Sequence, residues 1–383
     1  MNTNDETLAL CALNKIFGTY PRLGLSLLEE YGSATAVFHE KPPIPAHPEL
    51  AAQLTADALT WARQELERLE NSGFRFLGLH DEDYPAALRE CADPPLGLYL
   101  NGSTSPSEIF GLRPCIAFVG TRDISPYGRS WCQKLVAELS RAPVQPCIVS
   151  GMAFGADGIA HRTALECGLP TIGVMATGID KVYPWQHRDL AMAIVRAPGC
   201  ALITDYPMGT DPVAWNFVRR NRIIAGLSLA VIVVESKTKG GSLLTAKYAC
   251  SYGREVYALP GRADDIRSAG CNSLIREQMA QIITSPEQLA ADLGLMGSKG
   301  RGRAAERHEE VLRRALSTKY GPEAPAVVLG LALRTQPGAT AEELAAGAGL
   351  PFSQALQAMS LLELDGFSST DILGRCFLTP AWS

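Results

Sequence analysis

The sequence lacks the features of a membrane or secreted protein. None of its apolar runs approaches the ~20 residues that span a bilayer, and Met1–Glu6 has neither the basic start nor the apolar stretch of a signal peptide. Its ten cysteines include no C-x-x-C pair, and Cys115, Cys147 and Cys200 lie in or beside apolar runs, as buried free thiols do. We therefore expect a reduced, cytoplasmic protein with no cysteine zinc site and no membrane partner.

Two common phosphate-loop patterns are also missing. No G-x-G-x-x-G follows a predicted strand, and the chain contains no G-x-x-x-x-G-K-[ST]. These absences argue against a nicotinamide-dependent dehydrogenase and against a P-loop ATPase. A strong positive charge is missing too, because the net charge is −5. This lowers the expectation of nucleic-acid binding without excluding it, since a local basic patch is sufficient.

The length and composition predict a globular protein of two or three domains. The chain has 383 residues, of which 46% are hydrophobic and 20% charged. Residues 1–76 are predicted to form a helical domain, either a packing module or a module that binds partners. Its predicted helices are Leu8–Phe17, Leu23–Tyr31, which ends at Gly32, and Leu54–Leu69. Lys41–Pro48 is predicted to be a Pro-rich loop.

Residues 77–291 show a repeated pattern of strand, turn and helix. The predicted strands are Ile116–Val119, Ile148–Ser150, Thr171–Met175, Ala201–Thr204, Ala230–Glu235, Glu255–Leu259 and, more weakly, Gln281–Ile283. The predicted helices between them are Tyr127–Ser140, Ala156–Cys167, His187–Val195, Val213–Ala225 and Ser242–Ser251. This alternation predicts an α/β fold with a parallel, doubly wound sheet. Right-handed crossovers then bring the carboxyl ends of the strands to one edge, where ligands bind.

The remaining residues are predicted to form a linker and a small terminal domain. Residues 292–320 are read as a basic linker and a helix, and Gly297–Arg303 is its flexible part. In residues 321–383, predicted helices and a β-like tail resemble a winged helix: Pro325–Arg334, Thr340–Ala346, Phe352–Asp365 and the tail Gly366–Thr379. The third helix contains no Lys or Arg, so we expect protein contact or regulation rather than reading of a DNA groove.

Three strand ends carry residues suited to phosphate. The run Phe118–Arg122 is a buried strand that ends in Gly120, Thr121 and Arg122, which offer backbone N–H groups, a hydroxyl and a guanidinium. Similar loops follow later strands, at Ser150-Gly151 and at Lys239-Gly240-Gly241-Ser242. Each glycine loop taken alone is equally consistent with a tight turn. Together they favour an extended anionic ligand.

Three arginines lie within four residues at Arg219, Arg220 and Arg222. On a helix, Arg219 and Arg222 share a face and Arg220 points elsewhere. Guanidinium groups beside the strand ends would bind phosphate in a bidentate manner. The alternative is a solvated or salt-bridged helix face. We favour binding, because the chain as a whole is acidic.

Other residues leave more than one interpretation open. Asp157 and His161 stand four apart on one helix face, as a metal or acid–base pair would. A hydrogen-bonded structural pair is favoured, because no third ligand or nucleophile is evident nearby. Tyr127, Phe154 and Tyr183 are either platforms for nucleobases or core residues.

The motifs together resemble the DNA processing protein A (DprA/Smf) family over roughly Asp81–Ala291. The resemblance rests on DYP and LYLNG, then FVGTRDISPYG, SGMAFGADGIAH, GIDKVYP, DYPMGTDP, FVRRNRIIAGLS, VVESKTKGGSLLTAKYA, REVYALPG and GCNSLIRE in this order. Two positions depart from the family pattern. Ala156 replaces a usual isoleucine, which affects packing only, and Gly240 replaces a usual serine, which removes one possible hydroxyl contact.

The resemblance implies an extended Rossmann-like fold with an N-terminal helical (SAM/helix-hairpin-helix-like) domain and a C-terminal winged-helix-like domain. It implies a dimer that binds single-stranded DNA without cleaving it and loads the RecA recombinase during natural transformation, with no cofactor and no metal. Arg122 would be the main phosphate contact and Lys239 the second cation. The other implied contacts are Gly120, Thr121, Ser150, Gly151, Arg219, Asn221, Arg222, Gly240, Gly241 and Ser242.

Two other functions remain open at this point. A Rossmann-like nucleotide hydrolase or phosphoribohydrolase would need a glutamate beside the phosphate loop, and the nearest candidates are Glu235 and Glu255. An adaptor would use the end modules for binding and keep the strand-end loops only as a remnant. These alternatives differ in what they predict for single strands, duplexes and mononucleotides.

Overall fold

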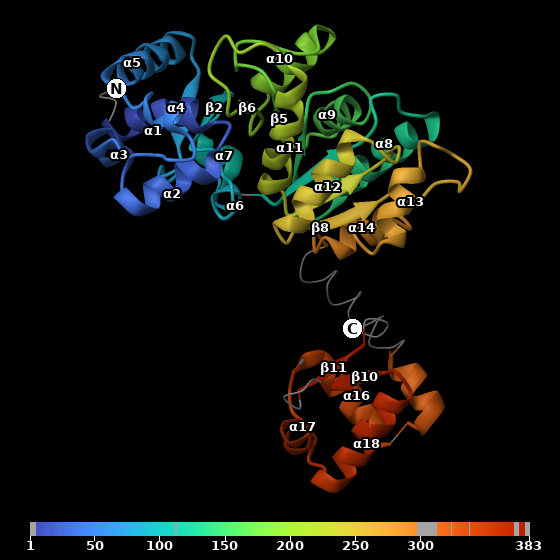
Figure 1. Cartoon of the computed structure of the whole chain (residues 1–383). Coiled ribbons are helices and arrows are strands. Elements are labelled where there is room, and N and C mark those ends of the chain that lie inside the picture. Colours follow the sequence, from blue (N-terminus) through green and yellow to red (C-terminus); the bar gives the residue numbers. More distant parts are fainter. Residues whose placement is uncertain are drawn as a thin grey trace. The chain divides into compact units, whose positions relative to one another are not determined.

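The computed structural model in Figure 1 describes residues 5–111, 113–296, 312–322, 324–336, 338–370 and 375–379. The chain divides into two compact units, Met1–Leu295 and Met296–Ser383. The predicted flexible linker Gly297–Arg303 lies outside the described residues. The predicted boundary between residues 1–76 and 77–291 stays a prediction, because both segments belong to the first unit.

The first unit begins with a group of helices. They are α1 (Asp5–Phe17), α2 (Pro21–Tyr31), α3 (Ala34–Glu40), α4 (Pro48–Ala51) and α5 (Ala56–Asn71). The three helices expected from the apolar spacing correspond to α1, α2 and α5, whereas α3 and α4 were not predicted. The predicted stop of α2 holds, because Gly32 adopts a left-handed conformation (φ +78°) and its N–H bonds the Leu28 carbonyl.

A nine-stranded sheet follows, with the strand order β1-β2-β6-β5-β4-β3-β7-β8-β9. The strands are β1 (Arg75–Gly78), β2 (Gly97–Asn101), β3 (Cys115–Val119), β4 (Cys147–Ser150), β5 (Thr171–Val174), β6 (Ala201–Thr204), β7 (Ala230–Val233), β8 (Glu255–Ala258) and β9 (Gln281–Ile282). Strands β3 to β9 pair in parallel, as predicted. Strands β1 and β2 add an antiparallel extension beside β6 and were not predicted.

The antiparallel extension carries the N-terminal helices. Helices α1 and α5 pack against β1, and α1 also packs against β2. Leu10 and Leu13 of α1 are buried in the same apolar core as Leu98 of β2 and Val149 of β4. The helical segment is therefore joined to the sheet through a continuous core.

Helices cover the parallel strands, as the alternating pattern predicts. The segments in chain order are α6 (Ala86–Arg89), α7 (Pro106–Phe110), α8 (Pro126–Arg141), α9 (Ala156–Glu166), the 3-10 turn η1 (Trp185–His187), α10 (Arg188–Arg196), α11 (Ala214–Leu227), α12 (Gly241–Ser251), α13 (Ala269–Arg276) and α14 (Pro286–Asp292). The five predicted interstrand helices correspond to α8 through α12. Helix α8 begins where expected, because Ser125 accepts the Gly128 N–H and Pro126 occupies the first turn.

The order of the parallel strands marks the ligand-binding edge. From β3 the chain runs outward through β4, β5 and β6, then returns to β7 on the other side of β3. The pair β3 and β7 is thus the switch point of a doubly wound sheet, where ligands bind outside the carboxyl ends. The two strand ends meet there, since the Thr121 N–H donates to the Glu235 carbonyl at 2.8 Å.

The second unit has the secondary structure of a winged helix. It contains α16 (Pro325–Thr335), α17 (Ala341–Ala348), α18 (Phe352–Leu364) and the antiparallel pair β10 (Ser368–Thr370) and β11 (Cys376–Leu378). Residues 312–320 form a further helix. Leu316, Leu329, Leu344 and Leu362 are buried together in its core. In the residues that the structure describes, neither unit has a helix long and apolar enough to cross a membrane.

Candidate nucleic-acid interface

The loop after β3 presents Arg122 at the carboxyl edge of the sheet. Arg122 is exposed, and its guanidinium carbon lies 5.6 Å from the centroid of the Phe217 ring on α11. The neighbouring loop after β4 approaches very closely, because a Cβ at Gly155 would lie 2.2 Å from the Thr121 carbonyl oxygen. Gly155 also has φ +74°, which a side chain disfavours. The position of Arg122 is therefore fixed by backbone packing between two loops.

The loop after β7 presents two lysines at the same edge. Lys237 and Lys239 are exposed, and α12 begins two residues after Lys239. Gly240 leaves no room for a side chain, since a Cβ there would lie 2.2 Å from Ser236 Oγ. The Ser242 hydroxyl donates to Ser236 Oγ at 2.9 Å, so it stabilises the loop from within. The predicted contact of Ser242 is therefore corrected, because this hydroxyl is buried, whereas Lys237 and Lys239 remain exposed.

A buried carboxylate occupies the amino end of α8. Glu235 is buried and accepts hydrogen bonds from the Ser125 N–H (2.9 Å) and from the Ser125 hydroxyl. A Cβ at Gly128 would lie 2.5 Å from the Glu235 carboxyl carbon, so the two segments pack tightly. In nucleotide-binding Rossmann folds, a phosphate binds at this helix terminus. In this chain the Glu235 carboxylate occupies the amino end of α8 instead.

The predicted contacts after β4 lie beneath the surface. Ser150 is fully buried and donates to the Phe118 carbonyl at 2.6 Å. Gly151 is buried as well, and its N–H donates to Asp157 Oδ2 at 3.1 Å. Its carbonyl accepts from Arg220 at 2.7 Å. Both residues therefore shape the loop, and their polar groups are already bonded inside the protein.

Asp157 and His161 are both structural, but they do not form the predicted hydrogen-bonded pair. Asp157 binds the N–H groups of the β4 loop, and its pKa is raised by burial and lowered in part by Arg220. His161 Nδ1 instead bonds Thr171 Oγ1 at 2.7 Å, while the Thr171 hydroxyl donates to the Ile148 carbonyl. Across the described residues, no group of His, Cys, Asp and Glu could hold a metal ion.

The burial of His161 predicts acid sensitivity of the fold. Burial lowers the pKa of His161 from its ordinary 6.5 to about 3. The unfolded chain therefore binds a proton below pH 6.5 that the folded chain excludes, so the free energy of unfolding should fall as pH decreases. Between pH 6.5 and pH 5 the contribution is about 2 kcal/mol. Urea denaturation of the wild type and of His161→Gln measures it.

In that comparison the His161→Gln variant should lose this part of the pH dependence. His39→Gln is the matched control, because it makes the same substitution at an exposed histidine. Equal pH dependence in the wild type and in His161→Gln would contradict the neutral, buried state of the imidazole.

The structure corrects the prediction for Arg222. Its side chain is 4% exposed, and its guanidinium bonds Asp205 Oδ2 at 2.6 Å and the Asp93 carbonyl. Burial lowers the pKa of Arg222, but the carboxylates of Asp205 and Asp93 outweigh burial and raise it overall. Arg222 is thus an internal ion-pair residue, because the unpredicted extension of the sheet brings the N-terminal segment over this side of α11.

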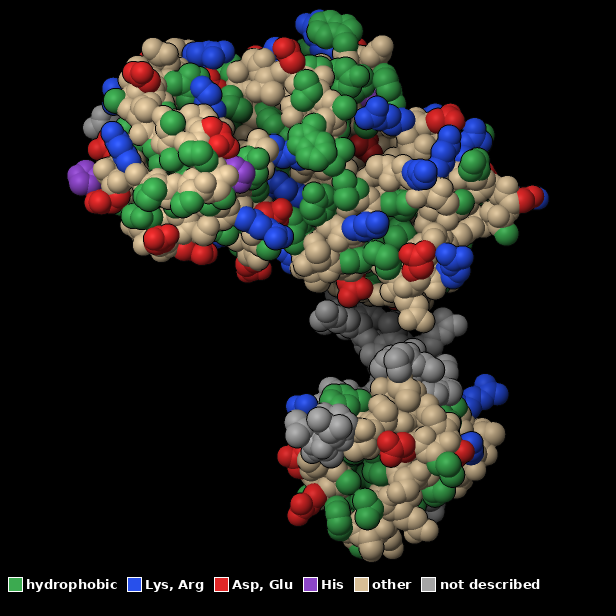
Figure 2. All heavy atoms as spheres, viewed as in Figure 1, with side chains coloured by type: hydrophobic (Ala, Val, Ile, Leu, Met, Phe, Trp, Pro, Cys, Tyr) green, Lys and Arg blue, Asp and Glu red, His purple; other side chains and the backbone are tan. Residues whose placement is uncertain are grey.

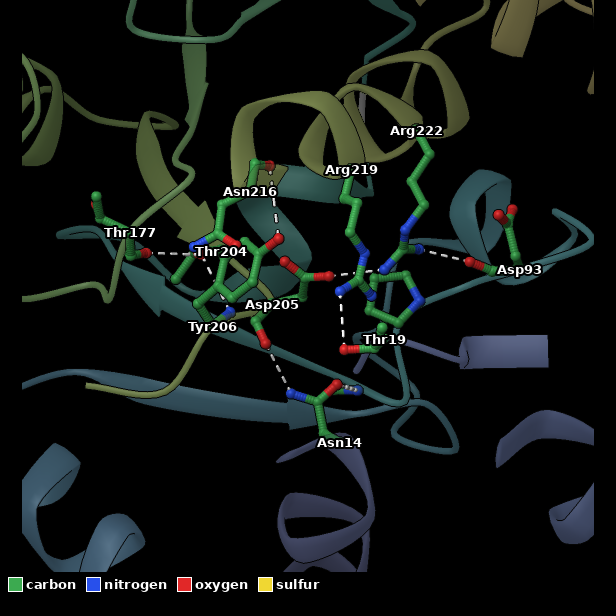
Figure 3. A network of polar contacts seen from close by, with 12 residues as sticks. Asn14, Thr19, Asp93, Thr177, Thr204, Asp205, Tyr206, Asn216, Arg219 and Arg222 are labelled. Carbon is green, nitrogen blue, oxygen red and sulfur yellow. Dashed lines mark hydrogen bonds and ion pairs between the residues drawn. The ribbon is translucent and has the colours of Figure 1, made fainter. Parts of the chain in front are cut away.

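The other members of the arginine cluster have separate positions. Figure 3 shows Arg219 and Arg222 extending from the same side of α11, Arg219 to Thr19 and Arg222 to Asp205 and Asp93, so they share a face as predicted. Arg219 is half-buried and donates to Thr19 Oγ1 at 3.0 Å. Asn221 is half-buried and donates to the Gly241 carbonyl at 3.4 Å, which links α11 to the start of α12.

Arg220 points elsewhere, as predicted, and lies beneath the strand ends. It is 4% exposed and donates to the carbonyls of Gly151 and Val174. Burial lowers the pKa of Arg220 to about 10, against the opposing effect of Asp157. Its guanidinium therefore stays charged at neutral pH and joins the loop after β4 to the end of β5.

Exposed aromatic side chains surround these loops. They are Tyr127, Phe154, Tyr183, Trp185 and Trp215. For Tyr127, Phe154 and Tyr183 the sequence allowed either a stacking role or a place in the core. Their exposure excludes a place in the core. Trp185 and Trp215 were not predicted, and the sequence signals are weak: Trp185 directly follows Pro184 in a loop, and Trp215 lies near the start of the predicted helix Val213–Ala225. Figure 2 shows Lys and Arg side chains over the region that Figure 1 labels α8, α12 and α13, with hydrophobic side chains exposed between them.

A family model and a curated relative match this chain. Residues 75–294 match the family described as DNA recombination-mediator protein A. The chain is 41% identical over 231 residues to the protein Smf of Synechocystis sp., a match that covers 60% of this chain and 57% of that relative. The chain thus spans little more than half the length of that protein.

Two solved structures share the fold. DNA processing protein A (DprA) of Streptococcus pneumoniae matches with a TM-score of 0.60 and 29% identity, covering 76% of this chain and 98% of that one. DNA processing protein A of Helicobacter pylori, whose structure is described as giving insight into its single-stranded DNA binding mode, matches with a TM-score of 0.51 and 30% identity. That match covers 57% of this chain and 95% of the other.

Proposed function

This chain belongs to the DNA recombination-mediator protein A family, and we propose that it binds single-stranded DNA along the carboxyl edge of its parallel sheet. The observation that carries this proposal is the exposure of Arg122 and Lys239 on the loops of the two switch-point strands, among exposed aromatic rings. Cations that follow a phosphate backbone, with rings on which bases stack, give sequence-tolerant binding. The single-stranded DNA binding of the H. pylori protein supports the same assignment.

Individual residues have distinct proposed roles. Arg122 is the main phosphate contact and Lys239 the second cation. Gly120 and Thr121 contribute backbone and hydroxyl on the first loop. Gly240 and Gly241 let the DNA backbone approach the second loop. Further residues act from beneath the surface by holding these loops in place: Ser150, Gly151, Arg220, Asn221 and Ser242.

A binding protein is favoured over a nucleotide hydrolase by the positions of the two candidate glutamates. Glu235 is buried against Ser125 and cannot reach a ligand without breaking two hydrogen bonds. Glu255 is exposed but lies at the start of β8, the amino end of a parallel strand, where it accepts from Gln281. The carboxyl ends of the strands are at the opposite edge. Neither glutamate is placed for catalysis beside Arg122.

The proposed role of the bound strand is delivery to the RecA recombinase. The family description as a recombination mediator supports this, because such a protein must protect a single strand and hand it to a recombinase. We also propose a homodimer formed through the Rossmann-like unit, with incoming DNA in natural transformation as the source of the strand. Co-sedimentation with RecA and a measurement of mass in solution test these two points.

A salt-titrated binding assay tests the proposed function. We expect a labelled oligo-dT strand to bind more tightly than a duplex of the same length, with log K falling by ~0.7 per phosphate contact for each tenfold rise in salt. Mononucleotides should neither compete at similar concentrations nor be hydrolysed. Turnover of free nucleotides would support the hydrolase instead. Stronger binding to the duplex would support the adaptor that uses its end modules.

A further inference from the structure

We propose that Tyr183, Trp185 and Trp215 form a stacking platform for the unpaired bases of the bound strand. This platform extends the site from the phosphate contacts at Arg122 toward the loops after β5 and β6. The inference rests on the proposed single-strand binding and adds the residues that would hold the bases. No relative or family description given above assigns a role to these three side chains.

The first step is a continuous contact from Arg122 to Tyr183. The Arg122 guanidinium lies 5.6 Å from the Phe217 ring centroid, and the Tyr183 ring packs edge-on against the same ring at 5.4 Å between centroids. Tyr183 nevertheless keeps 45% of its surface exposed. A phosphate bound at Arg122 would therefore place its neighbouring base within reach of an exposed aromatic face.

Trp185 continues this surface on an anchored segment. It is 67% exposed, with the Arg188 guanidinium 5.0 Å from its ring centroid. The turn η1 that carries it is held by His187, which is buried, donates from Nδ1 to the Met152 carbonyl at 2.9 Å and contacts the Phe154 ring. An exposed tryptophan on a fixed turn, beside a guanidinium, suits stacking on a base next to a phosphate.

Trp215 lies in the first turn of α11, the helix that also carries Phe217. It is 64% exposed, and Phe217 two residues later contacts both Tyr183 and Arg122. The intervening Asn216 is buried and donates to the Asp211 carbonyl, which fixes this end of the helix. Burial of each large ring would be strongly favourable, so the exposure of all three in the segments that follow β5 and β6 indicates a binding surface.

The charges around the platform favour stacking over phosphate contact as its main contribution. Asp211 is paired with Lys181 at 2.7 Å, and Asp180 accepts the Gly209 N–H at 2.8 Å. These acidic groups leave the β5 and β6 loops with less free positive charge than the Arg122 and Lys239 loops. Replacement of the tryptophans should therefore weaken binding and leave the salt dependence almost unchanged.

The test compares Trp185→Ala, Trp215→Ala and the double variant in the full chain. Fluorescence anisotropy with oligo-dT strands of increasing length gives the affinity, and salt titration gives the slope. We expect a loss of about 5-fold to 150-fold for each stacked base removed, with the loss appearing only for strands long enough to reach past Arg122. Trp185→Phe and Trp215→Phe should restore most of the affinity, since phenylalanine keeps a stacking face.

Separate outcomes distinguish this inference from the proposed function. If the double tryptophan variant binds every length as the wild type does, while Arg122→Ala with Lys239→Ala weakens binding, the platform is wrong and the proposed function stands. If neither change weakens binding, the proposed function fails as well. Should the alanine variants unfold, the phenylalanine variants decide: the quenching of tryptophan fluorescence by oligo-dT must decrease in each, and unchanged quenching overturns the platform.

Discussion

Replacing Arg122 and Lys239 together by alanine is expected to lower the affinity for single-stranded DNA at least about a hundredfold. Each charge-assisted hydrogen bond to phosphate contributes about 1.5–3 kcal/mol, and the two cations lie on the loops of the two strands that form the switch point. Both side chains are exposed, so their removal leaves no buried group without a partner. The fold should therefore be unaffected.

The salt dependence identifies the cause of this loss. Removal of two phosphate contacts should make the slope of log K against log salt shallower by about 1.4, twice the single-strand value of ~0.7. Mobility shift or anisotropy at several salt concentrations provides this slope. Arg122→Lys keeps the charge but loses the bidentate fork, so it should show an intermediate affinity with an almost unchanged slope.

A matched double variant controls for total charge. Arg113 precedes β3 and Arg196 ends α10, so both exposed arginines lie toward the amino ends of parallel strands, away from the proposed site. Arg113→Ala with Arg196→Ala changes the net charge by the same amount. Its affinity should stay close to that of the wild type. Equal losses in the two double variants would mean that charge alone, and no specific site, drives binding.

The parallel core of the fold could be predicted from the sequence because its strands are buried on both faces. Such strands are short continuous apolar runs, and Phe118, Val149 and Ile232 lie in runs of this kind. The strands β1 and β2 escaped prediction for a physical reason. β1 is only partly buried, so it is not a continuous apolar run, and neither strand belongs to the repeated alternation of strand and helix. The antiparallel pairing of β2 (Gly97–Asn101) with β6 (Ala201–Thr204) also joins segments that lie far apart in the chain.

The sequence also predicted which residues of the candidate site lie at the strand ends, but it did not predict how deeply each side chain is buried. Arg122 and Lys239 follow strands directly, so the fold alone places them at the carboxyl edge. The helical period places Arg219 and Arg222 on one face of α11 without saying what covers that face. Thr19 bonds Arg219 on that face, and Asp205 and the Asp93 carbonyl bond Arg222. The exposure of Trp185 depends on tertiary packing in the same way.

The buried position of Arg222 leads to a second strong prediction, on stability. Arg222→Met should lower the free energy of unfolding by about 3–5 kcal/mol, because it leaves the buried Asp205 carboxylate without its cation. The Asp93 carbonyl loses a donor at the same time. Urea denaturation followed by circular dichroism measures this change. Arg219→Met is the matched control on the same helix, and it should cost less than about 1 kcal/mol because its side chain is half-buried with one hydroxyl partner.

A second substitution separates the ion pair from simple packing. Arg222→Met combined with Asp205→Asn removes both charges, so the double variant should be more stable than Arg222→Met alone. If Arg222→Met lost stability only through poorer packing, adding Asp205→Asn would lower the free energy of unfolding further.

The same variants decide between the internal and the DNA-contacting role of Arg222. A residue that gripped phosphate would lose DNA affinity on replacement and keep its stability. The buried ion pair predicts the reverse: Arg222→Met loses stability, and the folded fraction binds single strands much better than Arg122→Ala does. The reason is structural. Arg222 of α11 bonds Asp205, which follows β6, and the Asp93 carbonyl, which precedes β2, so it holds three separate segments of the first unit together. An unchanged free energy of unfolding with weakened binding would return Arg222 to the DNA-contacting surface.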